Sequence, residues 1–472
     1  MIRENRTYAE LTVGDTAELT RLCTADDLFV FAHASGNLNP MHLPDMDGDG
    51  DGKAEAMAPA MWTASLISAV LGNILPGAGT LYRNQSLRFG ERAHSGDELR
   101  ACVEVVAKEP DGVVRLATRV DRPSDGALIV EGEALVRAPE VKMSAMEADV
   151  PGLLVNKHVH FDRLIERAAP LDPIPTAVVA PEEPNSLGGA ILAAEETIIT
   201  PILIGAQAKI EAAAAEMGAD LSRFEIIDVE EHGEAARRGV ALVHEGRARA
   251  LMKGHLHTDE LLSAVVRRDG GLRTGRRLTH VFVMDVPGLQ HPLLISDAAI
   301  NIAPDLETKV DIVQNAIDLG LSIGLEEPKV GVLSAVETVN PKIPSSVDAA
   351  ILSKMAERGQ IAGGLVDGPL AMDNAVDLEA ARTKGIKSLV AGRAEILIAP
   401  NIDAGNMLAK ELTFIAHAEG AGLVLGARVP IVLTSRSDGD KARLASCALA
   451  ALHMARLSGV QIPVAAAEKA AE

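Results

Sequence analysis

The sequence is poor in cysteine, in aromatic side chains and in long apolar runs. Its three cysteines, Cys23, Cys102 and Cys447, are far apart and odd in number, which argues against a disulfide scaffold and fits a reducing cytoplasm. One Trp, two Tyr and seven Phe leave no stock of rings on which nucleic-acid bases could stack. Every apolar stretch is broken before 18 residues, so no membrane span is expected. The charges after Met1 are followed by no apolar core, so we expect no signal peptide.

Basic charge is also scarce relative to acidic charge. Lys and Arg number 45 and Asp and Glu number 66, which gives a net charge of −21. Duplex DNA and anionic membranes bind surfaces that carry an excess of Lys and Arg, so neither is an expected partner. A small anionic ligand stays compatible with this balance, because it needs only a local basic cluster.

A length of 472 residues suggests two to four folding units, and residues 1–140 are the first. Thr24 is expected to cap a short helix that has Asp27 in its first turn. Residues 59–72 are apolar almost without interruption, which predicts a buried helix with Pro59 in its first turn. The alternating, strand-like segments that follow are 86–89, 98–106, 113–120 and 127–136. One buried helix with antiparallel strands predicts an α+β domain whose sheet wraps around the helix.

The pattern changes after residue 140. We expect a linker over residues 141–154 and an α/β domain over residues 155–465, because short apolar runs there are separated by Ala- and Glu-rich helical stretches. The expected strands are 177–179, 202–204, 250–252, 281–283, 330–333, 396–398 and 430–433. Strands without polar alternation are typical of a sheet that helices cover on both faces.

In the first unit, residues 35–42 have the sequence SGNLNPMH. Small residues and an Asn-Pro pair predict a tight loop that presents His42. On the motif alone, a purely structural loop is the simpler interpretation. Asn37 and His42 become candidate site residues only when the neighbouring sequence is considered.

Two other patterns imitate metal sites. Residues 45–50 begin like a calcium loop, but the twelfth position, where a carboxylate is needed, is Ala56, so a solvated acidic loop is preferred. The H-x-H pairs at residues 158–160 and 255–257 lack a third ligand nearby, so we expect structural histidines and no metal.

The SGNLNPMH block, with residues 27–32 and 61–68, resembles the MaoC-like hot-dog family of (R)-specific enoyl-CoA hydratases over residues 5–138. The resemblance implies that an Asp and a His at the two ends of D-x-N-P-x-H deprotonate a water and protonate the α-carbon. His42 matches that His, but Asn37 stands where the family has Asp. An amide holds water but cannot accept its proton at neutral pH. The implied function is an active hydratase, a weakened one that relies on His42, or a non-catalytic acyl-CoA-binding module.

In the second unit, polar residues follow the expected strands. They include Lys253, Asp297, Asn301, Ser334 and Glu337, and the Ser435-Arg436 pair after the last strand. Ligands of open α/β sheets bind at the carboxyl ends of strands. A hydroxyl, a guanidinium and backbone N–H groups at a helix start suit a phosphate or an oxyanion. The glycine-punctuated basic loop 271–277, which holds Arg273 and Thr274, is a second candidate for anion binding.

The same region resembles the phosphate acetyltransferase/phosphate butyryltransferase family over about residues 155–460. The segments that carry the resemblance are 364–375, 390–392, 400–406 and 433–436, and the strings GLRTG and LSAVE are closer to the butyryl branch. The resemblance implies two α/β subdomains related to isocitrate and isopropylmalate dehydrogenases, with the site in the cleft. It also implies that Ser435 and Arg436 contact the reacting carbonyl and phosphate. The family base is an Asp several residues later, for which Asp438 and Asp440 are both candidates.

The implied reaction is acyl-CoA plus phosphate ⇌ acyl phosphate plus CoA, with the coenzyme A thioester as substrate and no bound cofactor. A carboxylate would deprotonate the CoA thiol, and cations and hydroxyls would stabilise the oxyanion. Expected substrate contacts are Arg273, Thr274, Asp297, Asn301, Asp367, Asp403 and Asn406, although the last three could equally be turn-capping residues.

Two other function classes compete with an acyltransferase. A dehydrogenase on the related fold would want a G-x-G-x-x-G loop after its first strand, and the sequence has none there. A non-catalytic acyl-CoA sensor would use the first unit alone. We expect a cytoplasmic homo-oligomer, a dimer or larger.

Overall fold

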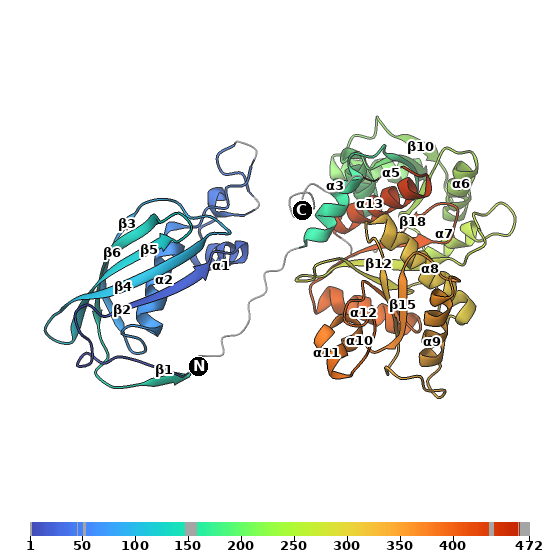
Figure 1. Cartoon of the computed structure of the whole chain (residues 1–472). Coiled ribbons are helices and arrows are strands. Elements are labelled where there is room, and N and C mark those ends of the chain that lie inside the picture. The colour runs from blue at the N-terminus through green and yellow to red at the C-terminus, as the bar shows by residue number, and fades with distance from the viewer. Residues whose placement is uncertain are drawn as a thin grey trace. The chain divides into compact units, whose positions relative to one another are not determined.

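The computed structural model describes residues 2–44, 46–50, 53–146, 158–433, 439–460 and 462. The chain forms two compact units, Met1–Val155 and Asn156–Glu472 (Figure 1). Within the described ranges, no helix is long and apolar enough to cross a lipid bilayer.

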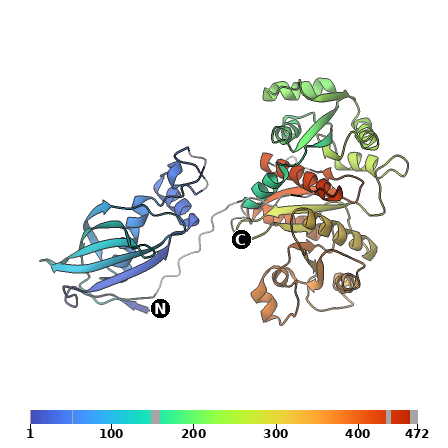
Figure 2. The same cartoon turned by 45° about the horizontal axis from the view of Figure 1, so that its top comes forward.

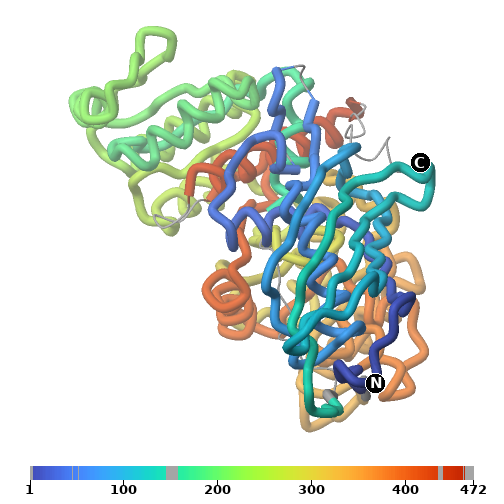
Figure 3. The backbone as a smooth tube through the Cα atoms, turned by 90° about the vertical axis from the view of Figure 1, so that its left-hand side faces the viewer, coloured from blue at the N-terminus to red at the C-terminus, as the bar shows by residue number. Residues whose placement is uncertain are grey.

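The first unit is an α+β domain in which an antiparallel sheet packs around one buried helix. The strands are β2 (Thr16–Leu22), β3 (Leu81–Phe89), β4 (Glu98–Lys108), β5 (Val113–Arg122) and β6 (Ala127–Arg137), in the order β2-β4-β5-β6-β3. Figure 3 shows these strands running side by side. The arrangement is the one expected of a hot-dog domain. The four predicted strands are confirmed as β3, β4, β5 and β6. Strand β2 was not predicted, because its alternation of apolar and polar residues is weak.

The central helix is α2 (Ala60–Asn73), and its apolar side chains form the core of the unit. Leu66, Ile67 and Val70 are at most 5% exposed. Pro59 precedes the helix as its N-cap, one position earlier than predicted. In α1 (Ala25–Ser35), Thr24 accepts a hydrogen bond from the Asp27 N–H and Asp27 accepts one from the Thr24 N–H, so the predicted cap is a full capping box.

The segment expected to be a linker begins as part of the first unit. Ser144–Met146 forms β7, which pairs antiparallel with β1 (Ile2–Glu4). Asn5 fastens this join, because its side-chain amide donates to the carbonyl oxygens of Ala78 and Val141 at 2.9 and 3.0 Å. The first unit therefore extends past Glu140. Residues 147–154 of the expected linker lie outside the described residues.

The second unit is built on a mixed sheet in the order β10-β9-β8-β11-β18-β17-β12-β13-β16-β14-β15. Its strands are β8 (Ile174–Val179), β9 (Ile199–Gly205), β10 (Glu225–Asp228), β11 (Ala250–Lys253), β12 (Thr279–Asp285), β13 (Leu293–Ser296), β14 (Lys329–Leu333), β15 (Leu365–Leu370), β16 (Ile396–Ile398), β17 (Glu419–Leu425) and β18 (Ile431–Val432). On one side of the sheet, strands β10, β9, β8, β11 and β18 run parallel. On the other side, strands β13, β16, β14 and β15 run parallel. The two antiparallel strands β17 and β12 join these halves, so the halves run in opposite directions.

Helices cover both faces of this sheet, as Figure 2 shows. The first face packs against α3 (Val159–Ala168), α4 (Pro184–Glu195), α5 (Gln207–Met217), α8 (Leu306–Ser322), α9 (Pro344–Glu357) and α13 (Asp440–Leu457) in one continuous core. The second face packs against α6 (His232–His244) and α7 (Thr258–Val265) over one half, and against α10 (Met372–Val376), α11 (Leu378–Thr383) and α12 (Ile402–Phe414) over the other. The predicted α/β class is confirmed.

Candidate functional site

On the second face, the apolar cores of the two halves are separate, and a strip that holds a buried histidine lies between them. One core includes Val424 of β17, and the other includes Met284 of β12, with Phe282 packed against it. Between them lies His280 of β12, which pairs across the strands with Val424, and Phe282 pairs with Gly422. The strip is thus where the two halves meet on one continuous sheet.

His280 occupies the middle of this strip and is 2% exposed. Its ring packs edge-on against Phe282 with a centroid distance of 4.3 Å. Burial lowers the pKa of His280 to about 4, and the opposing field of Asp297 only partly offsets that effect. The ring is therefore neutral at neutral pH.

Asp297 follows β13 and organises the loop beside His280. One carboxylate oxygen accepts hydrogen bonds from the backbone N–H groups of Ala299 and Ile300 at 2.9 and 3.0 Å. The other accepts from the backbone N–H and the side-chain amide of Asn301, at 3.3 and 2.6 Å. The structure therefore brings the predicted residues Asp297 and Asn301 into direct contact.

Helix α12 packs against the same loop. The Asn406 amide donates to the carbonyl oxygen of Ala298 at 3.2 Å, and the Ile402 N–H donates to the Ile302 carbonyl oxygen at 3.1 Å. Asn406 thus contacts the same loop that Asp297 and Asn301 organise. Asp403 is exposed in the first turn of this helix.

The carboxyl ends of β11 and β18 lie side by side, because these parallel strands pair Met252 with Val432. The loop that begins at Lys253 therefore starts next to Leu433, as the strand-end argument predicts. Lys253 donates to the carbonyl oxygens of Gly254 and Leu256, both at 3.2 Å.

Three of the four candidates that follow Leu433 lie outside the described residues, namely Ser435, Arg436 and Asp438. Their roles remain predictions. Asp440 is described, and it is the exposed first residue of α13.

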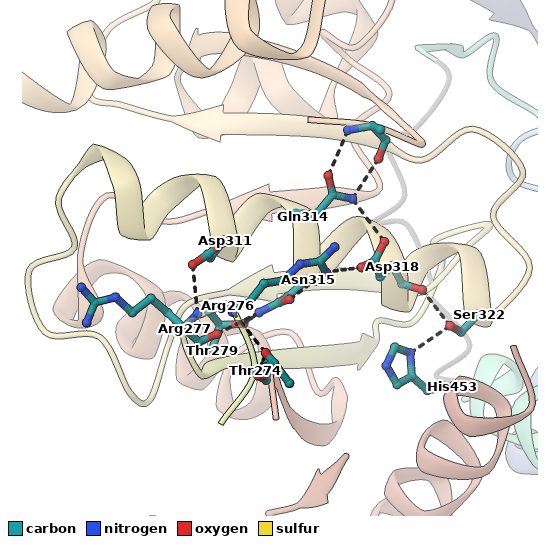
Figure 4. Close-up of polar contacts among 12 residues, drawn as sticks. Thr274, Arg276, Arg277, Thr279, Asp311, Gln314, Asn315, Asp318, Ser322 and His453 are labelled. Atoms are coloured by element: carbon teal, nitrogen blue, oxygen red, sulfur yellow. Dashed lines mark hydrogen bonds and ion pairs between the residues drawn. The ribbon is translucent and has the colours of Figure 1, made fainter. Parts of the chain in front are cut away.

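The basic loop 271–277 lies at the other end of β18. Thr274 donates to the Gly426 carbonyl oxygen at 2.6 Å, and Arg273 forms a β-bridge with Ala427, in the segment that leads into β18. Arg276 pairs with Asp318 of α8 (Figure 4). Arg273 and Thr274 are thus near the amino end of β18, whereas Ser435 follows its carboxyl end.

Asp367 is also separate from the strip. It lies on β15, the last strand of the sheet, three strands beyond β13. Its carboxylate accepts a hydrogen bond from the Gly368 N–H at 2.8 Å. Its contact with substrate remains a prediction, and so does the turn-capping alternative, since Asp367 and Gly368 both lie within the strand.

The H-x-H histidines each have a contact within the protein. The ring nitrogens of His158 and His160 bond to the carbonyl oxygens of His417 and Leu289 at 2.7 and 2.9 Å. His255 pairs with Glu183 at 2.8 Å, and His257 is the N-cap of α7. These contacts support structural roles.

The acidic loop has a partner that its spacing did not reveal. Glu55 accepts hydrogen bonds from the backbone N–H groups of Gly48 and Asp49 at 2.7 and 3.1 Å. Carboxylate oxygens of Asp47, Asp49 and Glu55 lie within 4.8 Å of one another. The carboxylate next to Ala56 thus turns back onto the loop, while residues 45, 51 and 52 lie outside the described part.

In the first unit, Asn37 and His42 lie in the loop after α1, as predicted. The side-chain oxygen Oδ1 of Asn37 accepts a hydrogen bond from the Asn39 N–H at 3.2 Å. His42 Nδ1 lies 2.9 Å from the Met57 carbonyl oxygen. Because a carbonyl only accepts, Nδ1 carries the proton and Nε2 keeps a lone pair that can accept one.

Sequence reasoning missed His280 altogether. It identified the apolar run 281–283 as a strand and passed over the histidine in front of it. The available signal was an ionisable residue inside an otherwise apolar strand, since such a residue is buried at an energetic cost. What the sequence could not show is that β12 is central and lies between the two parallel halves of the sheet.

Together, the fold and the strip define an α/β protein whose candidate site lies where strand ends from the two halves of the sheet converge. The sequence profile of the family described as "Phosphate acetyl/butaryl transferase" matches residues 232–451. A phosphate acetyltransferase of Rhizobium meliloti is 62% identical over 302 residues, which are 64% of this chain and 96% of that protein. The chain belongs to the phosphate acetyl/butyryl transferase family.

Two solved structures extend the comparison. A branched-chain phosphotransacylase from Enterococcus faecalis V583 is 32% identical, with a TM-score of 0.52, over 59% of this chain and 98% of that one. The R-hydratase PhaJ1 from Pseudomonas aeruginosa, in its unliganded form, is 40% identical, with a TM-score of 0.32, over 33% of this chain and 100% of that one.

Proposed function

We propose that the second unit interconverts a short-chain acyl-CoA plus phosphate with an acyl phosphate plus CoA. The observation that carries this proposal is the 62% identity to a phosphate acetyltransferase over nearly its whole length. The strip around His280 supports the proposal, because strand ends from both halves of the sheet meet there.

The chemistry needs no covalent enzyme intermediate. In the direction of acyl-CoA synthesis, the CoA thiolate attacks the acyl phosphate carbonyl, the C–O bond to phosphate breaks, and phosphate leaves. The thiol has a pKa of about 8.5, so a base assists its deprotonation. We assign that base to Asp438 or Asp440, and we assign Ser435 and Arg436 to the carbonyl and the phosphate. We assign Asp297, Asn301 and Asn406, which form the loop after β13 and the helix packed against it, to the wall of the same site.

The remaining expectations are part of the same proposal. Arg273 and Thr274, if they contact CoA, do so away from the reacting atoms, and Asp367 and Asp403 contribute at most to the outer wall. We infer a fold relationship to isocitrate and isopropylmalate dehydrogenases, a homo-oligomer, and a cytoplasmic location.

The purified chain tests the proposal directly. It is mixed with acetyl-, propionyl- or butyryl-CoA, with and without phosphate, and free thiol is measured. Phosphate-dependent release of CoA from at least one thioester is expected. Failure with all three, in a protein that is folded by circular dichroism, would refute the function.

For the first unit we propose hydration of an enoyl-CoA at a low rate. The favouring observation is the tautomer of His42, whose Nε2 is left able to accept a proton. Asn37 is the reason that the rate is low, because its amide cannot share that task. A unit that only binds acyl-CoA is the alternative, and turnover of crotonyl-CoA separates the two.

A further inference from the structure

The imidazole of His280 has a hydrogen-bonding group that nothing around it satisfies. Its Nδ1 is buried and has no hydrogen-bond partner among the described residues. Asp297, whose charge acts on the ring, does not serve Nδ1, and its two oxygens accept hydrogen bonds from residues 299–301 instead. An unpaired buried polar atom of this kind costs about 1–3 kcal/mol, so a native structure keeps one where a role requires it.

The missing partner also guides the choice of tautomer. We assign the one proton of the neutral ring to Nε2, because a proton on Nδ1 would be a buried donor with no acceptor among the described residues. That atom points across the strip towards β17. A Cβ on Gly422 would lie 2.7 Å from His280 Nε2 and 3.1 Å from the Leu433 carbonyl oxygen. The donor therefore lies close to the end of β18, and the ring packs into the space that a Cβ at position 422 would need.

The surroundings of the ring fit a neutral acceptor better than an anion. Phe282 packs against its side and Val424 pairs with it across the strands. The charged group whose field acts on the ring is the Asp297 carboxylate, which repels a phosphate dianion from the moment it binds but opposes a carbonyl oxygen only while that oxygen carries charge. A thioester or acyl phosphate carbonyl oxygen is neutral in the ground state and becomes negative only as the tetrahedral adduct forms.

From this arrangement we infer that His280 Nε2–H donates a hydrogen bond to the acyl carbonyl oxygen and holds it as the oxyanion develops. The inference rests on the proposed function of the second unit. When phosphate attacks the thioester, the new C–O bond forms, the carbonyl electron pair moves to oxygen, and the C–S bond breaks as the carbonyl re-forms. His280 keeps its proton throughout, and the thiolate takes one from solvent or from the base.

Two substitutions separate the donor from the bulk of the ring. His280→Phe removes the N–H and fills the space, and His280→Gln keeps an N–H donor. Loss of one oxyanion donor typically lowers kcat by about 10²–10³-fold. We expect His280→Phe to lose at least 100-fold in kcat with little change in KM for phosphate, and His280→Gln to retain activity within about tenfold of the wild type.

His453→Gln is the matched control, because His453 is also a buried neutral histidine but lies on α13 of the opposite face. It is bonded to Ser322 (Figure 4). The kcat of the His453→Gln variant is expected to stay within threefold of the wild-type value. A His280→Phe enzyme that melts normally and keeps kcat within threefold would overturn the inference.

A second measurement needs no turnover and can be made on the wild-type chain, so it does not depend on whether the variants fold. The infrared carbonyl band of ¹³C-labelled acetyl-CoA is recorded on the wild-type chain without phosphate. Hydrogen bonding by His280 shifts this band to lower wavenumber than in water, and His280→Gln keeps the shift. An unshifted band on the wild type would overturn the inference even if turnover is normal. A shifted band on a wild type that releases no CoA would refute the proposed function and leave the contact standing.

Discussion

The side-chain amide of Asn301 joins two neighbouring segments of the candidate site. It donates to the Asp297 carboxylate at 2.6 Å and to the Leu278 carbonyl oxygen at 2.9 Å. The loop after β13 is thereby fastened to the segment that enters β12, the strand that carries His280. The position of the loop is set by these bonds and by α12, which packs against it.

Asn301→Ala is expected to destabilise the second unit by about 1–3 kcal/mol, because two acceptors lose their donor in a half-buried place. Asn406→Ala removes one bond, of 3.2 Å to the Ala298 carbonyl oxygen, and should cost less. Urea unfolding of both variants checks the order. An Asn301→Ala protein as stable as the wild type would show that the amide does not fasten the loop.

Gly254 is needed because two backbones approach closely at the end of β11. A Cβ there would lie 2.2 Å from the Ala180 carbonyl oxygen. Gly254→Ala should therefore displace the strand end and destabilise the protein by about 1–3 kcal/mol or more. Gly275→Ala is the control, since its Cβ would meet no atom within 4 Å. Equal melting temperatures for the two variants would contradict this account.

The two buried histidines should make the second unit acid-sensitive. Burial lowers the pKa of His453 to about 4, below the value near 6.5 of an unfolded histidine. Between these values the unfolded chain binds a proton that the folded chain does not, so stability rises with pH and is lost as pH falls from about 6.5 to about 4. The upper limit of the loss is about 3 kcal/mol for one group.

His453→Gln removes that contribution and keeps a donor for Ser322. The difference in unfolding free energy between variant and wild type, measured by urea at several pH values, should change steadily across this window. A difference that is constant from pH 7 to pH 4 would mean that His453 titrates normally in the folded state.

In the first unit, Asn37→Asp should raise hydration of crotonyl-CoA by about 10²-fold or more, because it restores a carboxylate base. An Asp side chain can still accept the bond from the Asn39 N–H, so the loop should be unchanged. His42→Ala should abolish hydration, whereas His33→Ala, an exposed histidine of α1, should not. Loss of enoyl absorbance is the readout. Wild-type turnover of roughly 1–10³ per second that Asn37→Asp leaves unchanged would mean that Asn37 suffices.

Arg436→Ala should lower kcat/KM for the acyl transfer by at least 100-fold while the protein melts normally, because the guanidinium stabilises charge on the reacting groups. Arg358→Ala, an exposed arginine at the end of α9, is the matched control and should change nothing. A loss of less than tenfold for Arg436→Ala would place it outside the reacting centre.

The sequence predicted the elements whose pattern is local. The apolar run 59–72 became α2, and the short runs at 281–283 and 396–398 became β12 and β16. Strands β10, β15 and β17 were missed, because acidic or glycine residues interrupt them. The sequence gives no local sign of which strands are neighbours, so the reversal of direction at β17 and β12 was not foreseeable.

The same limit applies to the site. The Asp297 and Asn301 pair was predictable because both follow one strand. His280 was not, since its importance comes from strands more than 100 residues further along the chain. The basic loop at Arg273 was chosen for its charge, which does not tell at which end of a strand the loop lies.

The central claim is that this chain transfers an acyl group between CoA and phosphate. The most direct measurement counts both products in one reaction: free CoA by its thiol and acyl phosphate by conversion to a hydroxamate, with acetyl-, propionyl- and butyryl-CoA in turn. The account predicts equal molar amounts, formed only when phosphate is present, and re-formation of acyl-CoA from the isolated acyl phosphate and CoA. Release of CoA without phosphate, or without an equal amount of acyl phosphate, would contradict it.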